Sequence, residues 1–331
     1  MTGGDVTVIV PVWNGRALLE RLLAGLAAQT QVAAEVLVVD DFSADGSAEL
    51  AESMGARAIR MGARGGFAKA VNRGIRESRT PLVAIVNSDV EVAPDWLERL
   101  SAALAPDVWF AAPRILRAEA PDRIDGTYDA ICRGGASCRV GHALPDGPLF
   151  REARPIWSAP MTAALFRAEL FQQVGLLDER FEAYLEDVDF GVRCALAGFA
   201  GRYVPDAVAW HRGSATLGRW HAQTVRRISR NQVFLLAKYY PRRLLVRHAW
   251  PIIVAHGLWG LVALRRARGF AWLRGKVEGL RRWKTFREAG PAADPSAILR
   301  EGERSIRFVQ RYAGRDLYWT LYFLLTAGGA K

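Results

Sequence analysis

Cysteines and long apolar runs are both scarce in this chain of 331 residues. Its three cysteines are Cys132, Cys138 and Cys194, and they do not show the paired spacing of a zinc site. The gap between Cys132 and Cys138 could be bridged, but reduced thiols in a cytoplasmic protein are the simpler expectation. The N-terminal sequence MTGGDVTVIVPVWNG has no basic segment ahead of a long apolar one, which argues against secretion by a signal peptide.

The sequence signatures of several common enzyme classes are missing as well. There is no HExxH for zinc-dependent hydrolysis and no GxSxG for serine acyl transfer. Residues 65–69 (GGFAK) open a predicted helix, and their backbone N–H groups and lysine could approach a diphosphate. They lack the GKS or GKT ending of a P-loop and the spacing of GxGxxG, so an ordinary helix N-terminus with two glycines is the alternative.

Acidic residues are almost absent from one segment. Residues 202–290 hold 19 Lys or Arg and only 3 Asp or Glu, whereas residues 1–201 hold 20 and 27. The formal net charge of +11 therefore comes from residues 202–290. A segment of this charge predicts a polyanionic partner, for which nucleic acid and an anionic membrane surface are the two candidates.

The basic segment also contains a strongly apolar stretch, residues 249–264, between two groups of arginines. At 16 residues, with a proline and a histidine, it is shorter than the roughly 20 residues of a spanning helix. Trp250, Trp259, Trp272 and Trp283, interleaved with arginines, are typical of a segment that lies among lipid headgroups. A buried helix pair with a basic face is the alternative. We favour a peripheral protein at the inner face of the cell membrane over nucleic-acid binding, because a phosphate-reading surface does not need the apolar stretch.

Alternating patterns predict an α/β fold in the first hundred residues, where short apolar strands alternate with helical periodicity. The predicted strands are residues 6–12, 35–39, 56–61 and 82–86, and the predicted helices are residues 16–28, 47–54 and 67–79. Strands this apolar predict a mostly parallel sheet with helices on both faces. We expect one domain over residues 1–212, with an irregular insertion at about 114–157, and a helical, basic region over residues 213–331.

Three of the predicted strands end in polar residues, at the edge of a parallel sheet where ligands bind. These residues are Trp13-Asn14, Asp40-Asp41 and Asn87-Ser88-Asp89. One carboxylate of the aspartate pair could accept from a base or a ribose hydroxyl, and the other could cap the next helix. Asp89 with an oxygen ligand two residues earlier suits a hard divalent ion that bridges phosphates, although such tripeptides also form ordinary turns.

A cluster of carboxylates stands in the segment FEAYLEDVDFGVRCALAGF, residues 181–199. Glu186, Asp187 and Asp189 lie within four positions among apolar and aromatic residues, and clustered carboxylates need a cation, a proton or a polar ligand. A helix start with acids in its first turn is the alternative. A histidine such as His211 is more often a satisfied structural residue, but with Asp89 and this cluster it could complete a metal site.

Six segments of the chain, taken in order, resemble glycosyltransferase family 2, the inverting enzymes of GT-A fold. They are VTVIVPVWNG, EVLVVDDFSADGS, GGFAKAVNRGI, VAIVNSDVEVAPDWL, ALFRAELFQQVGLLDERFEAYLEDVDFGVRCALAGF and YVPDAVAWH, and they span about residues 6–211. The resemblance is to the rhamnosyltransferase-like branch that builds bacterial cell-surface polysaccharides. It implies a Rossmann-like nucleotide-binding domain, a metal-dependent hexosyl transfer, and Mg²⁺ or Mn²⁺ as cofactor.

The resemblance also implies a role for each matching residue. The residues that would bind the donor are Pro11, Trp13, Asn14, Asp40, Asp41, Gly66, Phe67, Asn72, Asn87 and Ser88. Asp89 would be the metal ligand in the DxD position, with His211 as a further metal or diphosphate contact. Asn87 replaces the first Asp of DxD, which leaves one strong anionic ligand. Asp187 would be the catalytic base and Glu186 a supporting or acceptor contact.

These inferences predict an inverting transferase that uses a nucleoside-diphosphate sugar, with dTDP-rhamnose as the favoured donor. The acceptor would be a glycan or a polyprenyl-diphosphate-linked molecule, and the oligomeric state is left open. A processive polysaccharide synthase is one alternative, but residues 223–227 (QTVRR) lack the tryptophan of its QxxRW motif. A non-catalytic sugar-nucleotide-binding protein is another, and the intact Asp89 and Asp187 argue against it.

Overall fold

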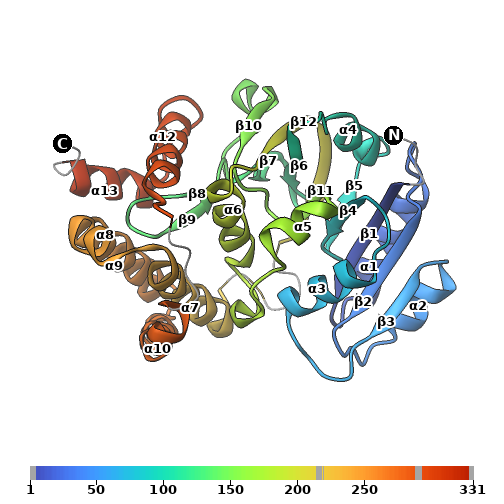
Figure 1. Cartoon of the computed structure of the whole chain (residues 1–331), viewed down its shortest axis with the longest axis horizontal. Coiled ribbons are helices and arrows are strands. Elements are labelled where there is room, and N and C mark those ends of the chain that lie inside the picture. Colours follow the sequence, from blue (N-terminus) through green and yellow to red (C-terminus); the bar gives the residue numbers. More distant parts are fainter. Residues whose placement is uncertain (1–4, 214–217, 219, 288–292, 328–331) are drawn as a thin grey trace. The chain divides into compact units, whose positions relative to one another are not determined.

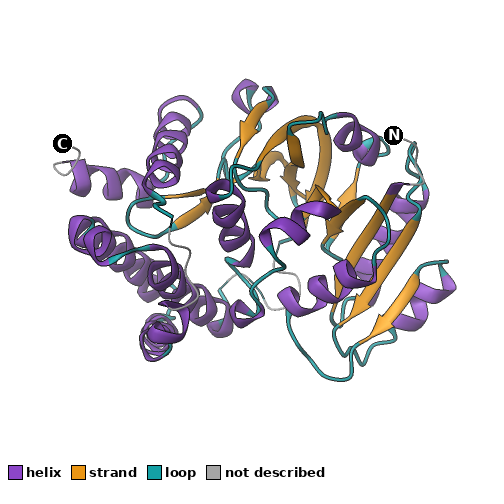
Figure 2. Ribbon diagram, viewed as in Figure 1, coloured by secondary structure: helices purple, strands orange, loops and turns teal. Residues whose placement is uncertain are grey.

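The computed structural model describes residues 5–213, 218, 220–287 and 293–327. By their internal contacts these residues form two compact units, and each is described separately (Figures 1 and 2). The sheet unit comprises Met1–Tyr128 and Gly141–Thr216, and the helical unit comprises Asp129–Val140 and Leu217–Lys331. Each unit is therefore assembled from two separate stretches of sequence.

The sheet unit is built from strands and helices that alternate along its N-terminal part. Its strands are β1 (Val6–Val12), β2 (Glu35–Asp40), β3 (Arg57–Arg60), β4 (Leu82–Val86), β5 (Val90–Val92), β6 (Val108–Arg117), β7 (Ala120–Gly126), β10 (Arg154–Ile156), β11 (Ala163–Arg167) and β12 (Ala200–His211). Its helices are α1 (Arg16–Ala27), α2 (Ser47–Ser53), α3 (Phe67–Glu77), α4 (Trp96–Ala102), α5 (Ala168–Val174) and α6 (Glu186–Leu196), with 3₁₀ turns η2 (Pro148–Arg151) and η3 (Glu179–Phe181). The seven elements predicted up to residue 86 agree with these bounds within two residues.

The strands form one mixed sheet in the order β10-β12-β6-β11-β4-β1-β2-β3, with β5 beside β12 and β7 beside β6. Parallel pairs join β1 to β2 and β4, β2 to β3, and β6 to β12. β11 runs antiparallel between β4 and β6. This arrangement confirms the predicted α/β class, with a large sheet flanked by helices. The sheet is mixed rather than mostly parallel, because four of the nine pairings between its described strands are parallel and five are antiparallel.

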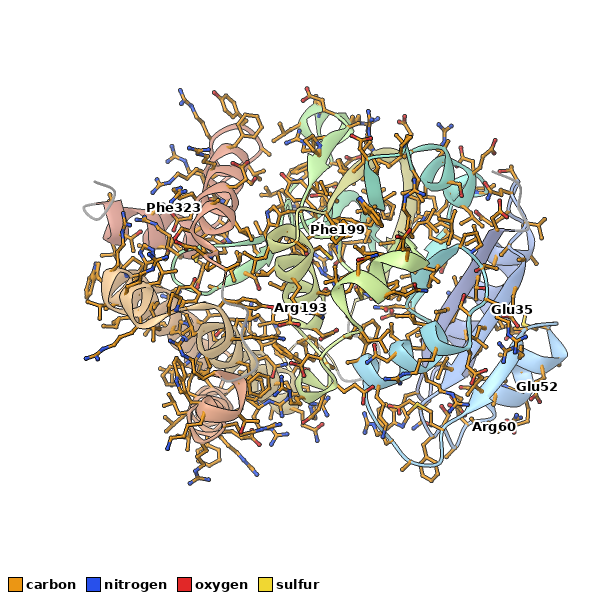
Figure 3. The ribbon with its side chains drawn as sticks, in the orientation of Figure 1. Glu35, Glu52, Arg60, Arg193, Phe199 and Phe323 are labelled. Carbon is orange, nitrogen blue, oxygen red and sulfur yellow. The ribbon has the colours of Figure 1, made fainter. Side chains whose placement is uncertain are left out.

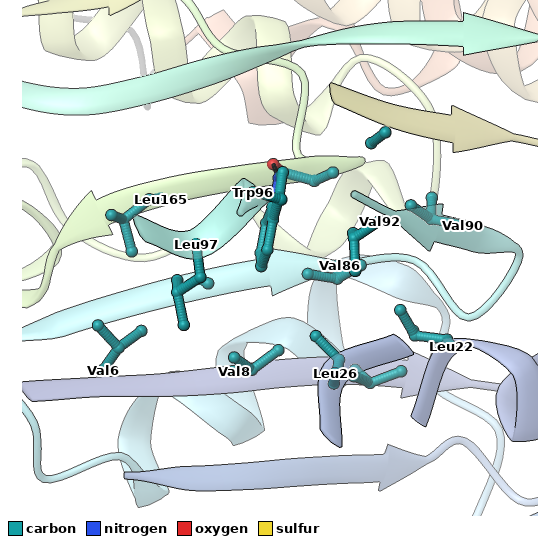
Figure 4. Packing of buried hydrophobic residues seen from close by; sticks show 14 of the residues in the cluster. Val6, Val8, Leu22, Leu26, Val86, Val90, Val92, Trp96, Leu97 and Leu165 are labelled. Atoms are coloured by element: carbon teal, nitrogen blue, oxygen red, sulfur yellow. Dashed lines mark hydrogen bonds between the residues drawn. The ribbon is translucent and has the colours of Figure 1, made fainter. Parts of the chain in front are cut away.

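The core of the sheet unit explains why its central strands are so apolar. β1 and β4 are buried along their whole lengths, as expected of parallel strands covered on both faces. Leu22 and Leu26 of α1 belong to the same buried cluster as Trp96 and Leu97 of α4 (Figure 4). The buried indole of Trp96 donates through Nε1 to the carbonyl of Ala163 at 3.2 Å. Burying one large apolar side chain contributes about 1.5–3 kcal/mol, so this cluster stabilises the frame that holds the strand ends.

Charged pairs lie along the sheet edge at β3. Arg57 of β3 pairs with Glu35 of β2 at 2.6 Å. Arg60 of β3 pairs with Glu52 of α2 at 2.6 Å (Figure 3). Because these side chains are exposed to solvent, each pair adds little to the stability of the fold. Their main effect is to place charges along an edge that would otherwise template pairing with another chain.

Strand β12 is longer than its sequence pattern predicts. We expect a strand over residues 202–204, but β12 extends to His211. The register with β6 shifts between Val204 and Val208, and Pro205, which has no N–H to donate, lies in the shifted part. This irregularity interrupts the strand pattern in the sequence. As a result His211 is the last residue of β12, rather than a residue beyond the predicted strand.

The helical unit consists of a hairpin and a set of helices. The hairpin is β8 (Asp129–Ile131) paired antiparallel with β9 (Ser137–Arg139), and the helices are α7 (Ala222–Tyr239), α8 (Arg242–Arg247), α9 (Ala249–Arg265), α10 (Gly269–Arg281), α11 (Trp283–Arg287), α12 (Ser296–Tyr312) and α13 (Leu317–Thr326). In the part of the chain that is described, none of the helices combines the length and the hydropathy needed to cross a bilayer. The predicted division into domains at residue 212 stays a prediction.

A buried polar network fixes the β8–β9 hairpin to α12 and α13. Glu303 of α12 accepts from Arg133 Nε at 2.8 Å and from the Arg133 backbone N–H at 3.2 Å. Tyr322 of α13 donates its hydroxyl to Glu303 at 2.7 Å and accepts from the N–H of Gly134 at 3.1 Å. The predicted insertion at 114–157 is thus divided, because its residues 129–140 pack within the helical unit.

Candidate active site

Asn14 ties the end of β1 to the loop that follows β2. Its N–H donates to Ser43 Oγ at 2.8 Å, and its Oδ1 accepts from the N–H of Ala44 at 2.8 Å. Asn14 has a φ of 48°, in the left-handed region that asparagine tolerates better than most residues. Asn14, which was predicted to bind the donor, is therefore held in place at the end of β1 by two hydrogen bonds.

The face of Trp13 is covered by an arginine. Arg64, in the loop between β3 and α3, places its guanidinium 3.2 Å from the centroid of the Trp13 ring, which is a cation–π contact. Pro11 is buried in β1, opposite Val39 of β2. An aromatic ring and a cation therefore stand at the carboxyl ends of the strands, where sheets of this type bind ligands.

Asp41 holds the glycine loop that precedes α3. Its Oδ1 accepts from the N–H of Gly65 at 2.6 Å and its Oδ2 from the N–H of Gly66 at 2.9 Å. Its neighbour Asp40 accepts from the N–H of Ser43 at 3.1 Å. Both aspartates are buried, so each is compensated by backbone donors. The predicted aspartate pair and the predicted glycine loop are thus directly linked.

Asp45, rather than Asp40 or Asp41, serves the start of α2. Its Oδ1 accepts from the N–H of Ser47 at 3.1 Å and from the Ser47 hydroxyl at 2.5 Å. Burial raises the pKa of Asp45, but hydrogen bonds from Ser47 and from the backbone of Arg16 outweigh it and lower this pKa below its ordinary value. The structure therefore does not give the aspartate pair the role of a helix cap.

The glycine loop contacts the segment that leads into α6. Gly66 has a φ of 86°, and a Cβ there would lie only 2.9 Å from the carbonyl oxygen of Glu182, so this position requires glycine. The N–H of Ala68 donates to the same carbonyl at 3.1 Å. Phe67 stands between these two contacts as the first residue of α3. The N-terminus of α3 is thus joined to the residues just before the acidic cluster.

Residues 182–185 have an unusual backbone. The φ angles are 64° at Glu182, 72° at Tyr184 and 67° at Leu185, in the left-handed region that side chains other than asparagine and aspartate rarely adopt. Each such residue costs about 1–3 kcal/mol, and strain of this kind clusters at functional sites. The strained segment delivers Glu186 and Asp187 to the first turn of α6.

Asp189 has a structural role within α6. It is fully buried, and its Oδ2 accepts from Arg193 Nε at 3.1 Å. Arg193 (Figure 3) also donates to the carbonyls of Val174 and Leu176 at 2.7 and 2.8 Å. Asp189 therefore orients an arginine that caps the end of α5.

Glu186 and Asp187 differ from Asp189 and from each other in their surroundings. Glu186 is buried, whereas Asp187 is partly exposed and accepts from the N–H of Val188 through Oδ1 at 2.9 Å. Their position in the first turn of α6 favours negative charge. Glu186 and Asp187 therefore form the start of α6, and this position is also compatible with a role in an acidic site.

Asn72 braces the chain ahead of the strained segment. This buried side chain donates to the carbonyl of Leu177 at 2.9 Å and to Glu179 at 3.0 Å, and it accepts from the N–H of Leu177 at 2.9 Å. These contacts attach residues 177–179 to α3. These hydrogen bonds of Asn72, which was predicted to bind the donor, therefore go to this loop.

The turn after β4 contains an amide oxygen that lacks a protein partner. The N–H of Asn87 donates to the carbonyl of Thr162 at 2.9 Å, but its Oδ1 is buried and makes no hydrogen bond to the described residues. A buried polar atom of this kind is costly unless water or a ligand satisfies it. Ser88 Oγ lies 3.4 Å from the position of a Cβ on Gly15, which places this turn next to the end of β1.

The structure brings Asp89 and His211 together. His211 lies in register with Val90 of β5, and its Nε2 is 3.3 Å from Asp89 Oδ1. Its Nδ1 is 2.8 Å from Oδ2 of Asp125 in β7. Burial lowers the pKa of His211, but hydrogen bonds with Asp125 and Asp89 outweigh burial and raise this pKa to about 9.

Asp89 and Asn87 offer oxygen ligands of the type that Mg²⁺ and Mn²⁺ use. Among the residues described, no three His, Cys, Asp or Glu side chains are arranged to hold a metal ion. Mg²⁺ needs no such cage, because it binds through one or two carboxylates together with substrate phosphates and water. The carboxylate of Asp89 and the unpartnered Oδ1 of Asn87 fit that mode of binding.

Arg64 and Asp125 contact residues of the candidate site, but the sequence patterns do not indicate either of them. Asp125 lies in the region predicted as an irregular insertion, 86 residues from its partner His211. No local motif marks either residue, since each gains its role from a distant partner. Covariation between distant positions is the kind of signal that could have identified Arg64 and Asp125.

Comparison with known proteins identifies the family. The sequence profile described as "Glycosyl transferase family 2" matches residues 7–175. The N-acetylglucosaminyl-diphospho-decaprenol L-rhamnosyltransferase of Mycobacterium tuberculosis is 30% identical over 246 residues, which cover 65% of this chain and 78% of that protein. The pre-mycofactocin glycosyltransferase of the same species is 31% identical over 224 residues, which cover 66% of this chain and 45% of that protein.

A solved structure supports the same conclusion at the level of the fold. The mannosyltransferase PcManGT from Pyrobaculum calidifontis, in complex with GDP-Man and Mn²⁺, matches with a TM-score of 0.53 and 19% identity. The match covers 98% of this chain and 86% of that one. Since the family profile covers half of the chain and the motifs, sheet and strand ends agree with it, this chain belongs to glycosyltransferase family 2 and has the GT-A fold.

Proposed function

We propose that this chain is an inverting glycosyltransferase that moves a hexosyl residue to a glycan or polyprenyl-diphosphate-linked acceptor in cell-surface polysaccharide synthesis. The observation that carries the proposal is the contact of Gly66 with Glu182. It brings a glycine loop, held by Asp41, against the residues that lead to Asp187. The name of the rhamnosyltransferase relative supports rhamnose as the sugar and a polyprenyl diphosphate as the carrier of the acceptor. The proposed donor is dTDP-rhamnose.

In this proposal the donor nucleotide occupies the carboxyl ends of β1, β2 and β4. Its binding residues are Pro11, Trp13, Asn14, Asp40, Asp41, Gly66, Phe67, Asn87 and Ser88, with Asn72 acting through the loop that it braces. Each carboxylate oxygen of Asp41 already accepts one N–H, and it retains a second lone pair for a ribose hydroxyl or a base N–H. The nucleotide would therefore lie against both the strand ends and the glycine loop.

In this proposal Asp89 and Asn87 would hold Mg²⁺ or Mn²⁺ beside the diphosphate, and His211 would be a further contact of the ion or of the diphosphate. When bound, such an ion neutralises the charge of the departing nucleoside diphosphate. Contacts within the protein already orient Asp89 in the absence of a donor. The backbone carbonyl of Asp89 accepts from the N–H of Arg212 at 3.1 Å, and its carboxylate faces His211.

Asp187 is the proposed catalytic base. The acceptor hydroxyl attacks the anomeric carbon from the side opposite the diphosphate, and its proton passes to Asp187 as the new C–O bond forms and the bond to the diphosphate breaks. The start of α6 favours the ionised carboxylate that can accept this proton. The buried Glu186 beside it supports the acceptor.

Binding of a donor can be measured by thermal unfolding with Mn²⁺ or Mg²⁺ and a series of nucleotide sugars, including dTDP-rhamnose and GDP-mannose. A true donor at 100 times its Kd stabilises the fold by about 2.7 kcal/mol, so we expect the Tm to rise by several degrees. Adding an acceptor should then release free nucleoside diphosphate. Stabilisation without release by any acceptor would favour a non-catalytic binding protein, and no stabilisation by any nucleotide sugar would contradict the proposal.

The helical unit has the features of a membrane-surface segment. Of the 17 large apolar side chains that are exposed in the described residues, 14 belong to this unit. On two packed helices they recur at helical spacing, and they are Trp250, Ile253, Leu261 and Leu264 on α9 and Phe270, Leu273, Val277 and Leu280 on α10. Arginines flank both helices. We propose that α9 and α10 lie on an anionic membrane, at the inner face of the cell membrane.

A single charge placed on this surface tests the membrane proposal. Leu264 is 62% exposed, and we expect Leu264→Asp to weaken binding to vesicles of anionic phospholipid about 10-fold or more, because burying a leucine contributes about 1.5–3 kcal/mol. Val32→Asp, at a side chain that is 64% exposed in the sheet unit, is the matched control and should change nothing. Co-sedimentation measures both. Equal effects of the two variants, or tighter binding to DNA than to vesicles, would contradict the proposal.

A further inference from the structure

His211 contacts two carboxylates, one at each nitrogen of its ring: Asp89 and Asp125. Asp125 Oδ2 lies 2.8 Å from Nδ1 of the imidazole, while Nε2, on the other side of the ring, lies 3.3 Å from Asp89 Oδ1. The side chains of His211 and Asp125 are each 8% exposed, and that of Asp89 is 13% exposed. The ring is therefore held at both nitrogens in surroundings with little water, where such contacts are strong.

A β-bulge places Asp125 in this position. Gly126 of β7 pairs with Ile115 of β6, and Ile124 pairs with the next residue, Leu116. Asp125 is thus the extra residue of the bulged strand, and bulges re-aim side chains and are frequent next to active sites. The residues on both sides of it are buried as well. A carboxylate in such a place costs free energy unless it has a partner, and His211 provides a close one at 2.8 Å.

A second histidine supports the bulge from the other side. His142 Nδ1 lies 2.7 Å from the backbone carbonyl oxygen of Asp125 and 3.8 Å from its Oδ1. This contact attaches the chain after the β8–β9 hairpin to the strand before it. Asp125 is therefore held through its backbone carbonyl as well as through its carboxylate.

We infer that Asp125 is the positioning residue of His211. A carboxylate that accepts the proton of Nδ1 leaves Nε2 as the nitrogen that meets a ligand. Carboxylates in this role orient histidines at metal sites. Asp125 therefore aims Nε2 toward Asp89, at the position where the ion and the donor diphosphate would bind in the proposed function. This inference rests on the proposed function, because it concerns the same Asp89 site.

The test uses the full chain with Mn²⁺ and inorganic pyrophosphate as probes. Asp125→Asn is the informative variant, because the amide can turn its NH₂ group toward Nδ1 and so favour the opposite tautomer. We expect it to weaken Mn²⁺ binding in the presence of pyrophosphate by about 10–100-fold. Asp122→Asn removes an exposed carboxylate from the same strand, and this control should change binding less than twofold.

A double-mutant cycle separates positioning from a general structural role. If Asp125 acts through His211, adding Asp125→Asn to His211→Ala weakens Mn²⁺ binding no further. A second measurement needs no variant of Asp125: the carboxylate-held Nδ1–H of His211 should give a downfield proton resonance in the wild-type chain. With five histidines in the chain, its loss in His211→Ala assigns the signal.

The outcomes distinguish this inference from the proposed function. Wild-type affinity for Mn²⁺ in a folded Asp125→Asn chain, additive losses in the double variant, or absence of the downfield resonance would each overturn the positioning role alone. A wild-type chain that binds no Mn²⁺ with pyrophosphate would overturn the proposed metal site and this inference together.

Discussion

Asp187→Asn is expected to lower kcat by about 10²–10⁴-fold, which is the usual contribution of a general base. The amide keeps the shape of the carboxylate, and its oxygen can still accept from the N–H of Val188, as Asp187 Oδ1 does at 2.9 Å. It cannot take a proton from the acceptor hydroxyl. The affinity for the donor should therefore stay within a few-fold of the wild-type value, because the proposed nucleotide position is at the strand ends and not at Asp187.

Single-turnover kinetics and nucleotide titrations check this expectation. Asp189→Asn is the matched control, since it makes the same chemical change two residues further along α6. Asp189 is buried against Arg193, so we expect that control to lower the stability of the protein and to leave kcat of the folded enzyme close to the wild-type value. Loss of donor binding in Asp187→Asn, or full turnover, would remove Asp187 from the role of base.

Glu303→Leu is expected to lower the free energy of unfolding by about 3–5 kcal/mol, the range for breaking a buried ion pair. Glu303 accepts three hydrogen bonds, two from Arg133 and one from the hydroxyl of Tyr322. Without it, the buried guanidinium of Arg133 loses a carboxylate that lies 2.8 Å from its Nε and helps to compensate its charge. The cost arises from that charge rather than from lost packing.

Urea unfolding of the full chain measures the effect. Glu301→Ala, on the same helix, is the control: its contact with Arg304 is 3.5 Å long and exposed, so the change should stay within about 0.5 kcal/mol. Replacing both partners, in the variant Arg133→Met with Glu303→Leu, should recover part of the loss. A Glu303→Leu chain that unfolds like the wild type would show that the network does not hold the hairpin.

The parts of the fold that follow from local patterns were predictable from the sequence. β1 and β4 are continuous apolar runs, and both strands have the predicted bounds. α3 begins at Phe67 because Gly66, with its positive φ, ends the loop before it. β12 was predicted too short, since Pro205 lies in an irregularity that local periodicity cannot cross.

The site was predictable as a set of residues but not as a set of contacts. Strand ends and family motifs indicate Asp41, Asp89 and Asp187, because each follows or opens a recognisable element. They do not show that Asp41 binds the N–H groups of the glycine loop, or that Asp125 stands behind His211. Such contacts join residues 24 and 86 positions apart, and composition and spacing carry no information over that distance.

The discontinuous helical unit imposes an order of events on synthesis. Arg133 leaves the ribosome 170 residues before its partner Glu303. Because protein synthesis proceeds at about 5–20 residues per second, roughly 10–30 s pass between synthesis of the hairpin and synthesis of the helix that buries it. The sheet unit can close around its own strands during that time, while the Arg133 guanidinium remains in water. The last helices of the chain therefore complete a structure whose first piece was made before half of the protein existed.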